Sequence, residues 1–306
     1  MRRGELPPKP RELNVHDQHY PDRKGRALAL PFRFKEHIMP TAAIRIMGIL
    51  NTTPDSFSDG GRHFSLPAAM AQAERMIAEG VDIIDIGGES TRPFSDPVST
   101  QEELRRVIPL IREIRKSHAT AISIDTTKAA VAREALNAGA DIINDISALD
   151  KDADMPALAR TTEAPIIIMH MQGTPETMQV NPHYDNVVED ILTFFRERIS
   201  WLEGKGINRR RLIIDPGIGF GKTLEHNLSI VKHLDRFSEL ELPVLLGHSR
   251  KRFLRTLTGL EAVDCDLPTA VVSALAVNQG VSIIRVHDVA ATRQALLIAD
   301  AISKAP

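Results

Sequence analysis

Eight short runs of apolar residues recur along the chain, and nearly every one ends abruptly in a charged or amide residue. Each run has the length of a strand and is rich in isoleucine, leucine or valine. Continuously apolar strands are buried on both faces, which is typical of a parallel sheet covered by helices. The runs are Ile44–Asn51, Val81–Gly88, Ala121–Thr127, Asp141–Ser147, Ala164–Met171, Arg211–Ile218, Pro243–Ser249 and Val281–Val289.

Segments with helical patterning separate these runs. Pro67–Gly80 repeats apolar residues at helical spacing and ends at a glycine, and Ser99–Lys116 opens with a pattern resembling a capping box. Eight strand-then-helix units favour an α/β fold, the (β/α)8 TIM barrel, whose active site lies at the carboxyl ends of the strands. Further helices are expected at Lys128–Ala138, Asn186–Glu203, Leu224–Leu234, Leu267–Asn278 and Ala290–Ser303.

The first forty residues differ from the rest of the chain. They contain six prolines and many charges without a sustained period, which predicts a loosely ordered N-terminal extension over residues 1–40. The remaining residues, 41–306, match the roughly 250 residues of one barrel. We therefore expect a single catalytic domain preceded by that extension.

Composition excludes several classes of protein. A net charge of −2 gives no general electrostatic reason to bind nucleic acid or an anionic membrane. No apolar stretch approaches the roughly 20 residues that span a bilayer. The single cysteine, Cys265, rules out an internal disulfide framework and fits a reducing cytoplasm, where we expect the protein to reside.

Polar residues at the ends of the first and last runs suit a phosphate group. Arg285 and His287 are two residues apart and therefore share one face of a strand, and a closed barrel makes the last strand the neighbour of the first, which ends at Asn51. A guanidinium, an imidazole and an amide suit a phosphate or diphosphate, and Asn51 could also supply an oxygen to Mg²⁺. The structural alternative is an ion pair of Arg285 with Asp288 or a helix.

Acceptor groups end the strands between them. Asp85, Asp125, Asn144 and Asp215 could converge across the barrel mouth and accept hydrogen bonds from a flat ligand rich in N–H donors, such as a 2-amino-4-oxo heterocycle. Convergent carboxylates could instead bind a divalent metal or cap helices, and both readings stay open. A histidine-rich metallohydrolase is disfavoured, because His170 has no obvious partner in the sequence.

Three loops carry unusual compositions. Residues 51–61 and 87–93 combine polar groups with glycines that can absorb backbone changes, although both could be simple solvated connections. Residues 215–223 suggest a nucleotide-binding loop, but Pro216 stands where the Walker spacing needs a glycine. The glycines there more plausibly let the backbone approach a ligand, with Phe220 as an apolar wall.

Lys251 follows the seventh run and offers two chemistries. It shares a strand face with Gly247 and Ser249 if that strand persists. A lysine at this place could be a Schiff-base nucleophile or a cationic hydrogen-bond donor. A nearby Asp215 would keep the ammonium group charged, which favours the donor.

Nine motifs in the right order give the chain a resemblance to the dihydropteroate synthase family across roughly residues 44–303. Together they are far more specific than any one of them. They are Met47–Gly61, Ile84–Pro93, Ser123–Thr126, Ile143–Ile146, Met169–Gly173, Asp215–Gly217, Gly219–Lys222, Ser249–Lys251 and Ile284–Asp288.

The resemblance implies a transferase that condenses 6-hydroxymethyl-7,8-dihydropterin diphosphate with p-aminobenzoate in folate biosynthesis. By motif position, the residues implied for the pterin are Asp85, Asp125, Asn144, Ile146, Met169, Asp215 and Lys251. Those implied for the diphosphate are Asn51, Arg285 and His287, with Mg²⁺ bridging it to Asn51. Those implied for p-aminobenzoate are Phe57, Thr91, Arg92, Pro93, Phe220 and Ser249.

The resemblance also implies an order of events and an assembly. Diphosphate leaves first, and Asp59 helps to stabilise the resulting pterin cation, with Lys251 and Arg285 completing the catalytic set. Phe94 stands where the family often has glycine, so it could narrow the p-aminobenzoate pocket and alter sulfonamide sensitivity. A homodimer through the late helices, 267–278 and 290–303, is expected.

Two other functions fit part of the pattern. A pterin-binding methyltransferase barrel would share the acidic pocket, but it needs neither a p-aminobenzoate loop nor a diphosphate grip. A non-catalytic pterin-binding paralogue would keep the pocket without the chemistry, and the intact Asn51, Asp59, Lys251 and Arg285 argue against such decay.

Overall fold

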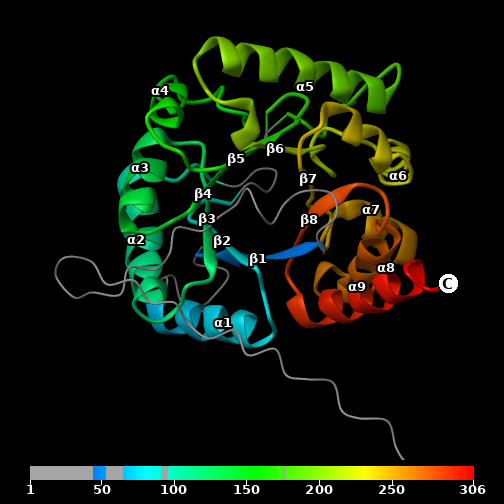
Figure 1. The fold of residues 1–306 in the computed structure, drawn as a ribbon, viewed down its shortest axis with the longest axis horizontal. Coiled ribbons are helices and arrows are strands. Elements are labelled where there is room, and N and C mark those ends of the chain that lie inside the picture. The colour runs from blue at the N-terminus through cyan, green and yellow to red at the C-terminus, as the bar shows by residue number, and fades with distance from the viewer. Residues whose placement is uncertain (1–43, 53–64, 91–95, 175–176) are drawn as a thin grey trace, which may run out of the picture. The chain divides into compact units, whose positions relative to one another are not determined.

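The computed structural model describes residues 44–52, 65–90, 96–174 and 177–306, and these ranges contain the barrel (Figure 1). The expected N-terminal extension, residues 1–40, lies outside the described residues, so its boundary stays a prediction. Six of the residues expected at the site also lie outside them. They are Phe57, Asp59, Thr91, Arg92, Pro93 and Phe94.

The described strands form a closed parallel barrel in sequence order, which confirms the expected (β/α)8 TIM barrel. The barrel closes where β8 pairs with β1, with Met47 beside Arg285, and Asn51 of β1 pairs with Gly87 of β2. The strands are β1 Arg45–Asn51, β2 Ile83–Gly87, β3 Ala121–Asp125, β4 Ile142–Asp145, β5 Ile166–Met169, β6 Leu212–Asp215, β7 Val244–Leu246 and β8 Val281–Val286.

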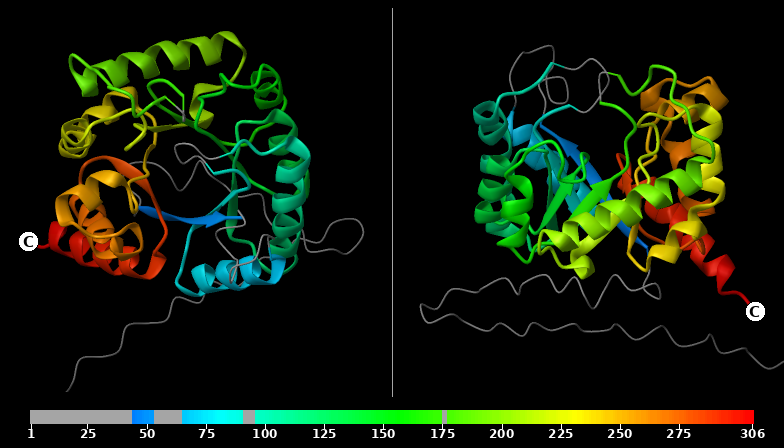
Figure 2. Two further views of the ribbon diagram at one scale, coloured as in Figure 1. Left: turned by 180° about the vertical axis from the view of Figure 1, so that it is seen from behind. Right: turned by 90° about the horizontal axis from the view of Figure 1, so that it is seen from above.

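Helices surround the strands, as the views from two directions show (Figure 2). Short 3-10 turns, η3 Arg209–Arg211, η4 Leu234–Leu240 and η5 Ala262–Asp264, fill the connections. The helices are α1 Leu66–Ala78, α2 Thr100–Ser117, α3 Ala129–Ala138, α4 Met155–Arg160, α5 Val187–Gly204, α6 Leu224–Lys232, α7 Arg252–Thr258, α8 Asp266–Leu275 and α9 Val289–Ser303. Among them, none is long and apolar enough to cross a membrane.

The helix pattern in the sequence misses two of these elements. The six-residue α4 and the seven-residue α7 complete the alternation, and neither was expected. Each is too short to repeat an apolar stripe over several turns, so it leaves no helical period in the sequence. α7 ends at Gly259, whose φ of 71° is the left-handed conformation that favours glycine at a helix end.

The strands are shorter than the apolar runs that predict them. The seventh run was expected to reach Ser249, but β7 ends at Leu246. Gly247, Ser249 and Lys251 therefore lie beyond the strand, and the side that they share is set by the turn instead of by strand parity. Lys251 instead stands at the N-terminal cap of α7. Loops, rather than strand ends, therefore carry several of the expected site residues.

Two kinds of packing hold the barrel. The strand residues of β2 and β5 are all buried, as expected for strands covered on both faces. Burying one such aliphatic side chain contributes about 1.5–3 kcal/mol. A second, smaller apolar cluster contains Ile146, Met169, Met178 and Phe220. Ile146, Met169 and Phe220 lie at or beyond the carboxyl ends of β4, β5 and β6, so this cluster belongs to the barrel mouth.

Arginines brace the amino-terminal end of the barrel. Arg115 of α2 donates to the carbonyl oxygens of Gly139 at 2.7 Å and Thr120 at 2.5 Å, and it also contacts Asp141. Arg211 is buried and donates to the carbonyls of Ala159 at 2.8 Å and Ala164 at 2.7 Å. These guanidinium groups supply hydrogen bonds to backbone carbonyls of the segments that lead into β3, β4 and β5.

Candidate active site

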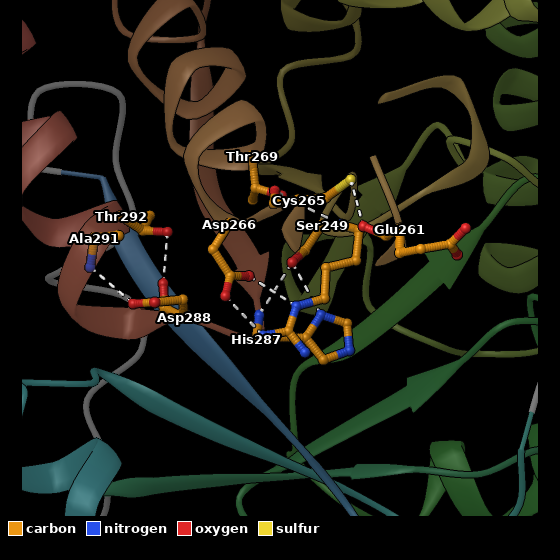
Figure 3. Close-up of polar contacts among 10 residues, drawn as sticks. Ser249, Glu261, Cys265, Asp266, Thr269, His287, Asp288, Ala291 and Thr292 are labelled. Carbon is orange, nitrogen blue, oxygen red and sulfur yellow. Dashed lines mark hydrogen bonds and ion pairs between the residues drawn. The ribbon is translucent and has the colours of Figure 1, made fainter. Parts of the chain in front are cut away.

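Arg285 is the centre of the barrel mouth. From β8 it donates through Nε to Asp85 Oδ2 of β2 at 2.6 Å and through Nη2 to Asp125 Oδ2 of β3 at 2.7 Å. The ion pair with Asp288 that the sequence allowed is wrong, because Asp288 instead accepts from the Ala291 amide and caps α9 (Figure 3). The guanidinium of Arg285, which was predicted to bind a phosphate, is thus paired with two of the carboxylates that were predicted to bind the heterocycle.

Asn51 lies near this ion pair, and Gly87 lies beside both. A Cβ added at Gly87 would lie 3.4 Å from Asn51 Oδ1 and 3.8 Å from Asp125 Oδ2. The two oxygens therefore border the same point, at which a Cβ would make only ordinary van der Waals contacts. The strand register sets Arg285 beside Met47, so Asn51 lies four residues further toward the carboxyl end of β1.

Asn144 and Asp215 add acceptors on either side. Asn144 donates through Nδ2 to Asp85 Oδ2 at 3.2 Å, so its carbonyl oxygen Oδ1 is the atom that it offers to a ligand. Asp215 accepts the Gly217 amide on Oδ1 at 2.7 Å, which fixes the carboxylate at the end of β6. Oδ2 of Asp215 lies 3.4 Å from the Cβ position of Gly247. The mouth thus presents a carboxylate and an amide oxygen from separate strands.

Burial sets the charge of the carboxylates. It raises the pKa of Asp125 to about 7, against the opposing pull of Arg285. Burial also raises the pKa of Asp215, although the Gly217 amide and Lys251 favour its charged form. Raised carboxyl pKa values mean that the charged forms are under-solvated, and a ligand with N–H donors would stabilise them.

Lys251 lies over an aromatic ring. Its Nζ is 4.0 Å from the centroid of the Phe220 ring, which is a cation–π contact. Burial lowers the pKa of Lys251 to about 8, and Asp215 opposes this shift, as expected, by favouring the charged form. At neutral pH the group is still mainly an ammonium, which suits a hydrogen-bond donor more than a Schiff-base nucleophile.

The apolar cluster joins two pockets that the sequence kept apart. Ile146 and Met169, expected at the pterin, share one cluster with Phe220, expected at p-aminobenzoate. Met178 is a fourth buried member that sequence reasoning missed, because it lies outside the nine motifs, and Met171 packs against the cluster. A flat ring placed against this cluster would have an apolar face and acidic neighbours.

Ser249 and His287 link the loops after β7 and β8. Ser249 Oγ lies 2.9 Å from His287 Nδ1 and accepts the His287 amide at 3.2 Å (Figure 3). Two residues expected on different substrates are therefore directly bonded. That Asn51 lies close to His287 stays a prediction.

A buried pair behind the glycine loop was missed. Lys222 Nζ lies 3.0 Å from His170 Nδ1 and donates to the Phe220 carbonyl at 2.9 Å. Burial lowers the pKa of Lys222 to about 7 and that of His170 to about 2. His170 thus has a lysine as its hydrogen-bond partner instead of a second metal ligand, and the pair holds the loop that carries Phe220. The sequence feature that could have indicated this pair is Lys222, the last residue of the motif Gly219–Lys222.

Comparisons with known proteins identify the class. Residues 47–287 match the family model of pterin binding enzymes, and the chain belongs to that family. Its relatives include the dihydropteroate synthases of Haemophilus influenzae, 46% identical over 85% of this chain and 94% of that one, and of Escherichia coli K12, 46% identical over 84% and 90%. The resemblance to dihydropteroate synthase is confirmed.

Solved structures agree. A Xanthomonas albilineans dihydropteroate synthase with 4-aminobenzoic acid has a TM-score of 0.81 and 45% identity, and it covers 86% of this chain and 94% of its own. The same enzyme in complex with 7,8-dihydropteroate has a TM-score of 0.78 and 43% identity, covering 86% and 95%. The likeness therefore extends over nearly the whole barrel.

Proposed function

We infer that the protein is a dihydropteroate synthase. It condenses 6-hydroxymethyl-7,8-dihydropterin diphosphate with p-aminobenzoate, and 7,8-dihydropteroate and diphosphate are the products. The observation that carries this conclusion is the 46% identity to a dihydropteroate synthase over 94% of that enzyme's length. The convergence of Arg285, Asp125 and Lys251 on one barrel mouth supports it from the side of chemistry.

The pterin ring is proposed to lie among the acceptors of the mouth. Asp125, Asn144 and Asp215 offer oxygens to the N–H groups of a 2-amino-4-oxo ring, and Lys251 donates to a ring nitrogen or oxygen. Asp85 holds Asn144 and Arg285 in place, so it acts beside the ring. Ile146 and Met169 supply the apolar face of the pocket.

The diphosphate is proposed to bind where Arg285, Asn51 and His287 border the mouth. Arg285 already donates to Asp85 and Asp125, so a diphosphate would share this guanidinium or displace a carboxylate from it. A guanidinium has five donors, and two of them are used by these acids. The remaining donors fit phosphate oxygens in a bidentate pattern.

Mg²⁺ is proposed to arrive with the diphosphate. Within the described ranges, no group of three His, Cys, Asp or Glu side chains could hold a metal by itself. Asn51 Oδ1 lies near Asp125 across Gly87, which offers the hard oxygen ligands that this ion prefers. Because Mg²⁺ keeps several waters and shares phosphate oxygens, one or two protein ligands suffice, and its charge would neutralise the departing diphosphate.

The p-aminobenzoate is proposed to lie against Phe220 and Ser249. Phe220 is buried in the mouth cluster, and Ser249 presents a hydroxyl beside His287. Phe57, Thr91, Arg92 and Pro93 complete the proposed pocket from parts of the chain outside the described residues. An aromatic wall and a hydroxyl suit a flat aryl carboxylate.

The proposed reaction loses diphosphate before the amine attacks. Arg285 and His287 stabilise the negative charge of the leaving group, and the acceptors around the pterin favour the cation left on its exocyclic carbon. Asp59 is proposed to stabilise the same cation. An arylamine is a weak nucleophile, so a dry pocket lets it compete with water for this cation.

One assay separates this function from its alternatives. Release of diphosphate from the dihydropterin diphosphate is measured with and without p-aminobenzoate. A synthase releases diphosphate in a strictly p-aminobenzoate-dependent manner and forms dihydropteroate. A non-catalytic paralogue binds the pterin and releases nothing, and a methyltransferase barrel behaves in the same way but transfers a methyl group to a corrinoid protein. Either of these results would overturn the proposal.

A homodimer through α8 and α9 is also proposed. These helices pack together and expose large apolar side chains, among them Leu267 at 73%, Leu275 at 61% and Ile302 at 70% of their surface. Contiguous exposed apolar residues mark interaction surfaces. Sedimentation should give twice the chain mass for the natural protein, and Leu275→Asp should give the mass of one chain.

The location and domain plan complete the proposal. We place the protein in the cytoplasm, where a reducing environment suits its one cysteine, Cys265, a buried free thiol. The catalytic domain is proposed to occupy residues 41–306, after an extension of forty residues. Deleting residues 1–40 and measuring turnover tests that division, and a loss of folding would contradict it.

A further inference from the structure

The four residues after Gly247 alternate between two neighbours. His248 and Arg250 face α8. His248 Nε2 lies 2.9 Å from the Thr269 carbonyl oxygen. Arg250 makes a bidentate ion pair with Asp266, in which Nε donates to Oδ1 at 2.7 Å and Nη2 donates to Oδ2 at 2.8 Å. The Arg250 amide also donates to Thr269 Oγ1 at 3.2 Å. Asp266 and Thr269 both belong to the first turns of α8 (Figure 3).

The other two residues of the turn face the barrel mouth. Ser249 bonds His287, and the Lys251 ammonium lies over the Phe220 ring. In the proposed function, Ser249 binds p-aminobenzoate and Lys251 binds the pterin. The anchored side chains and the substrate side chains are therefore consecutive along the chain, and any slip of the anchored pair must move the other pair.

Arg250 has an unusual backbone conformation. Its φ is 55°, in the left-handed region that residues with a Cβ seldom adopt. Such a conformation persists only where the surroundings hold it in place. Here the surroundings are a bidentate ion pair and an amide hydrogen bond to the same helix, and the hydrogen bond that Arg250 donates to Asp266 raises the pKa of Arg250.

We propose that Arg250 is a positioning residue for this reaction, which holds the turn in its left-handed form through Asp266 and thereby places Ser249 and Lys251 at the substrates. The inference rests on the proposed function for the roles of those two residues. The inference gives a role in the reaction to Arg250, which is not among the proposed substrate-binding residues. It also gives a role to α8, the helix that carries the exposed Leu267 and Leu275.

The test uses the full chain with Arg250→Ala, Arg250→Gly and Arg250→Lys. Misplacing catalytic groups by about 1 Å costs up to about 10²-fold, so Arg250→Ala should lower kcat/KM by at least about tenfold, mostly through kcat. Glycine adopts the left-handed conformation without a Cβ, so Arg250→Gly should be more active than Arg250→Ala. Lysine keeps the charge but not the fork, and it should be as impaired as alanine.

Matched variants separate positioning from stability. Arg255 on α7 forms an exposed ion pair with Glu261 at 3.4 Å, so Arg255→Ala should leave kcat/KM within about twofold. Asp266→Ala should reproduce Arg250→Ala, and the double variant should lose no more than either single variant, because one acts through the other. Activities are compared per folded molecule, below the melting transition of each variant.

Several results would overturn the inference. They are normal kcat/KM in Arg250→Ala, losses that multiply in the double variant, or Arg250→Gly no better than Arg250→Ala. If the natural chain forms no dihydropteroate, the proposed function fails, but positioning is still tested by a crystal structure of Arg250→Ala. That structure should show Ser249 parted from His287 and Lys251 moved off Phe220. Both contacts intact would refute positioning.

Discussion

The two ends of the barrel use arginine in opposite ways. At the amino-terminal end, Arg115 and Arg211 donate chiefly to backbone carbonyls of the loops that enter the strands. At the mouth, Arg285 donates to carboxylates from two different strands. A backbone carbonyl is fixed and neutral, whereas a carboxylate can exchange its partner for a ligand.

Burial disfavours charge at both ends, since it lowers the pKa values of Arg115 and Arg211 and raises that of Asp141 at the amino-terminal end. The mouth keeps Asp125 and Lys251 with pKa values moved toward neutrality by burial, so each is held in a form that the protein alone solvates poorly. Groups perturbed in this way gather at functional sites, because a bound ligand relieves the penalty. What separates the two ends is the partner: the amino-terminal arginines donate chiefly to backbone carbonyls, and we propose that they serve stability and that the mouth charges serve the ligand.

The largest effect is expected for catalysis at the mouth. Arg285→Ala and Lys251→Ala should each lose at least about 10²-fold in kcat/KM, the usual result of removing a charge-stabilising donor. Lys251→Ala should leave the free energy of unfolding at pH 7 unchanged or higher, because a buried amine with a lowered pKa disfavours the fold. Steady-state kinetics measure kcat/KM, and urea unfolding measures the free energy of unfolding. Near-normal turnover in both variants would contradict the proposed difference between the mouth and the amino-terminal end.

The opposite outcome is expected at the amino-terminal end. Arg211→Ala leaves the buried Ala159 carbonyl and the partly buried Ala164 carbonyl without this donor. It should lower the free energy of unfolding by about 3 kcal/mol, since hydrogen bonds to charged groups contribute about 1.5–3 kcal/mol each. Its kcat/KM per folded molecule should stay within about twofold. The exposed neighbour is the control, and Arg210→Ala should change neither quantity. A catalytic defect in Arg211→Ala would contradict the division of labour.

The pH profile should be narrow. Below about pH 7 Asp125 takes up a proton and loses its pair with Arg285, and above about pH 8 Lys251 loses its charge. We therefore expect kcat/KM to be bell-shaped, with a maximum between these values and a fall of about tenfold per pH unit on each side. Rates measured across both limbs decide the matter, and a flat profile would show that neither ionisation governs binding.

The smallest effect is expected for drug sensitivity. Phe94 lies outside the described residues, and its ring is predicted to narrow the p-aminobenzoate pocket. Phe94→Gly should then bind a sulfonamide more tightly, by about tenfold or less, as for other changes of pocket size. Inhibition constants of the natural and variant enzymes provide the comparison. Equal constants would mean that the ring points away from the pocket.

The barrel itself was predictable because its signal is local. The strand Ile166–Met169 is apolar along its whole length, and burial on both faces leaves that mark in a parallel strand. The short helices α4 and α7 leave no such mark. The end of β7 was also misjudged, because the chain beyond Leu246 is held by side-chain bonds to α8 instead of by the sheet.

The sequence predicted which polar residues lie at the barrel mouth, but not the ion pairs and hydrogen bonds between them. Polar strand ends pointed to Asp85, Asp125 and Arg285 one by one. Their ion pairs join residues up to 200 positions apart, and they depend on how side chains turn into the barrel, which no periodicity records. The pairing of His170 with Lys222 was missed for the same reason.

Pterin affinity tests the central claim most directly. The dissociation constant of 6-hydroxymethylpterin is measured by calorimetry for Asp125→Asn and Asp215→Asn at the mouth, and for Asp141→Asn beside Arg115 at the other end. The account predicts at least about tenfold weaker binding for the mouth variants, since each loses a charged acceptor, and a change within about twofold for Asp141→Asn. Natural affinity in both mouth variants would contradict it.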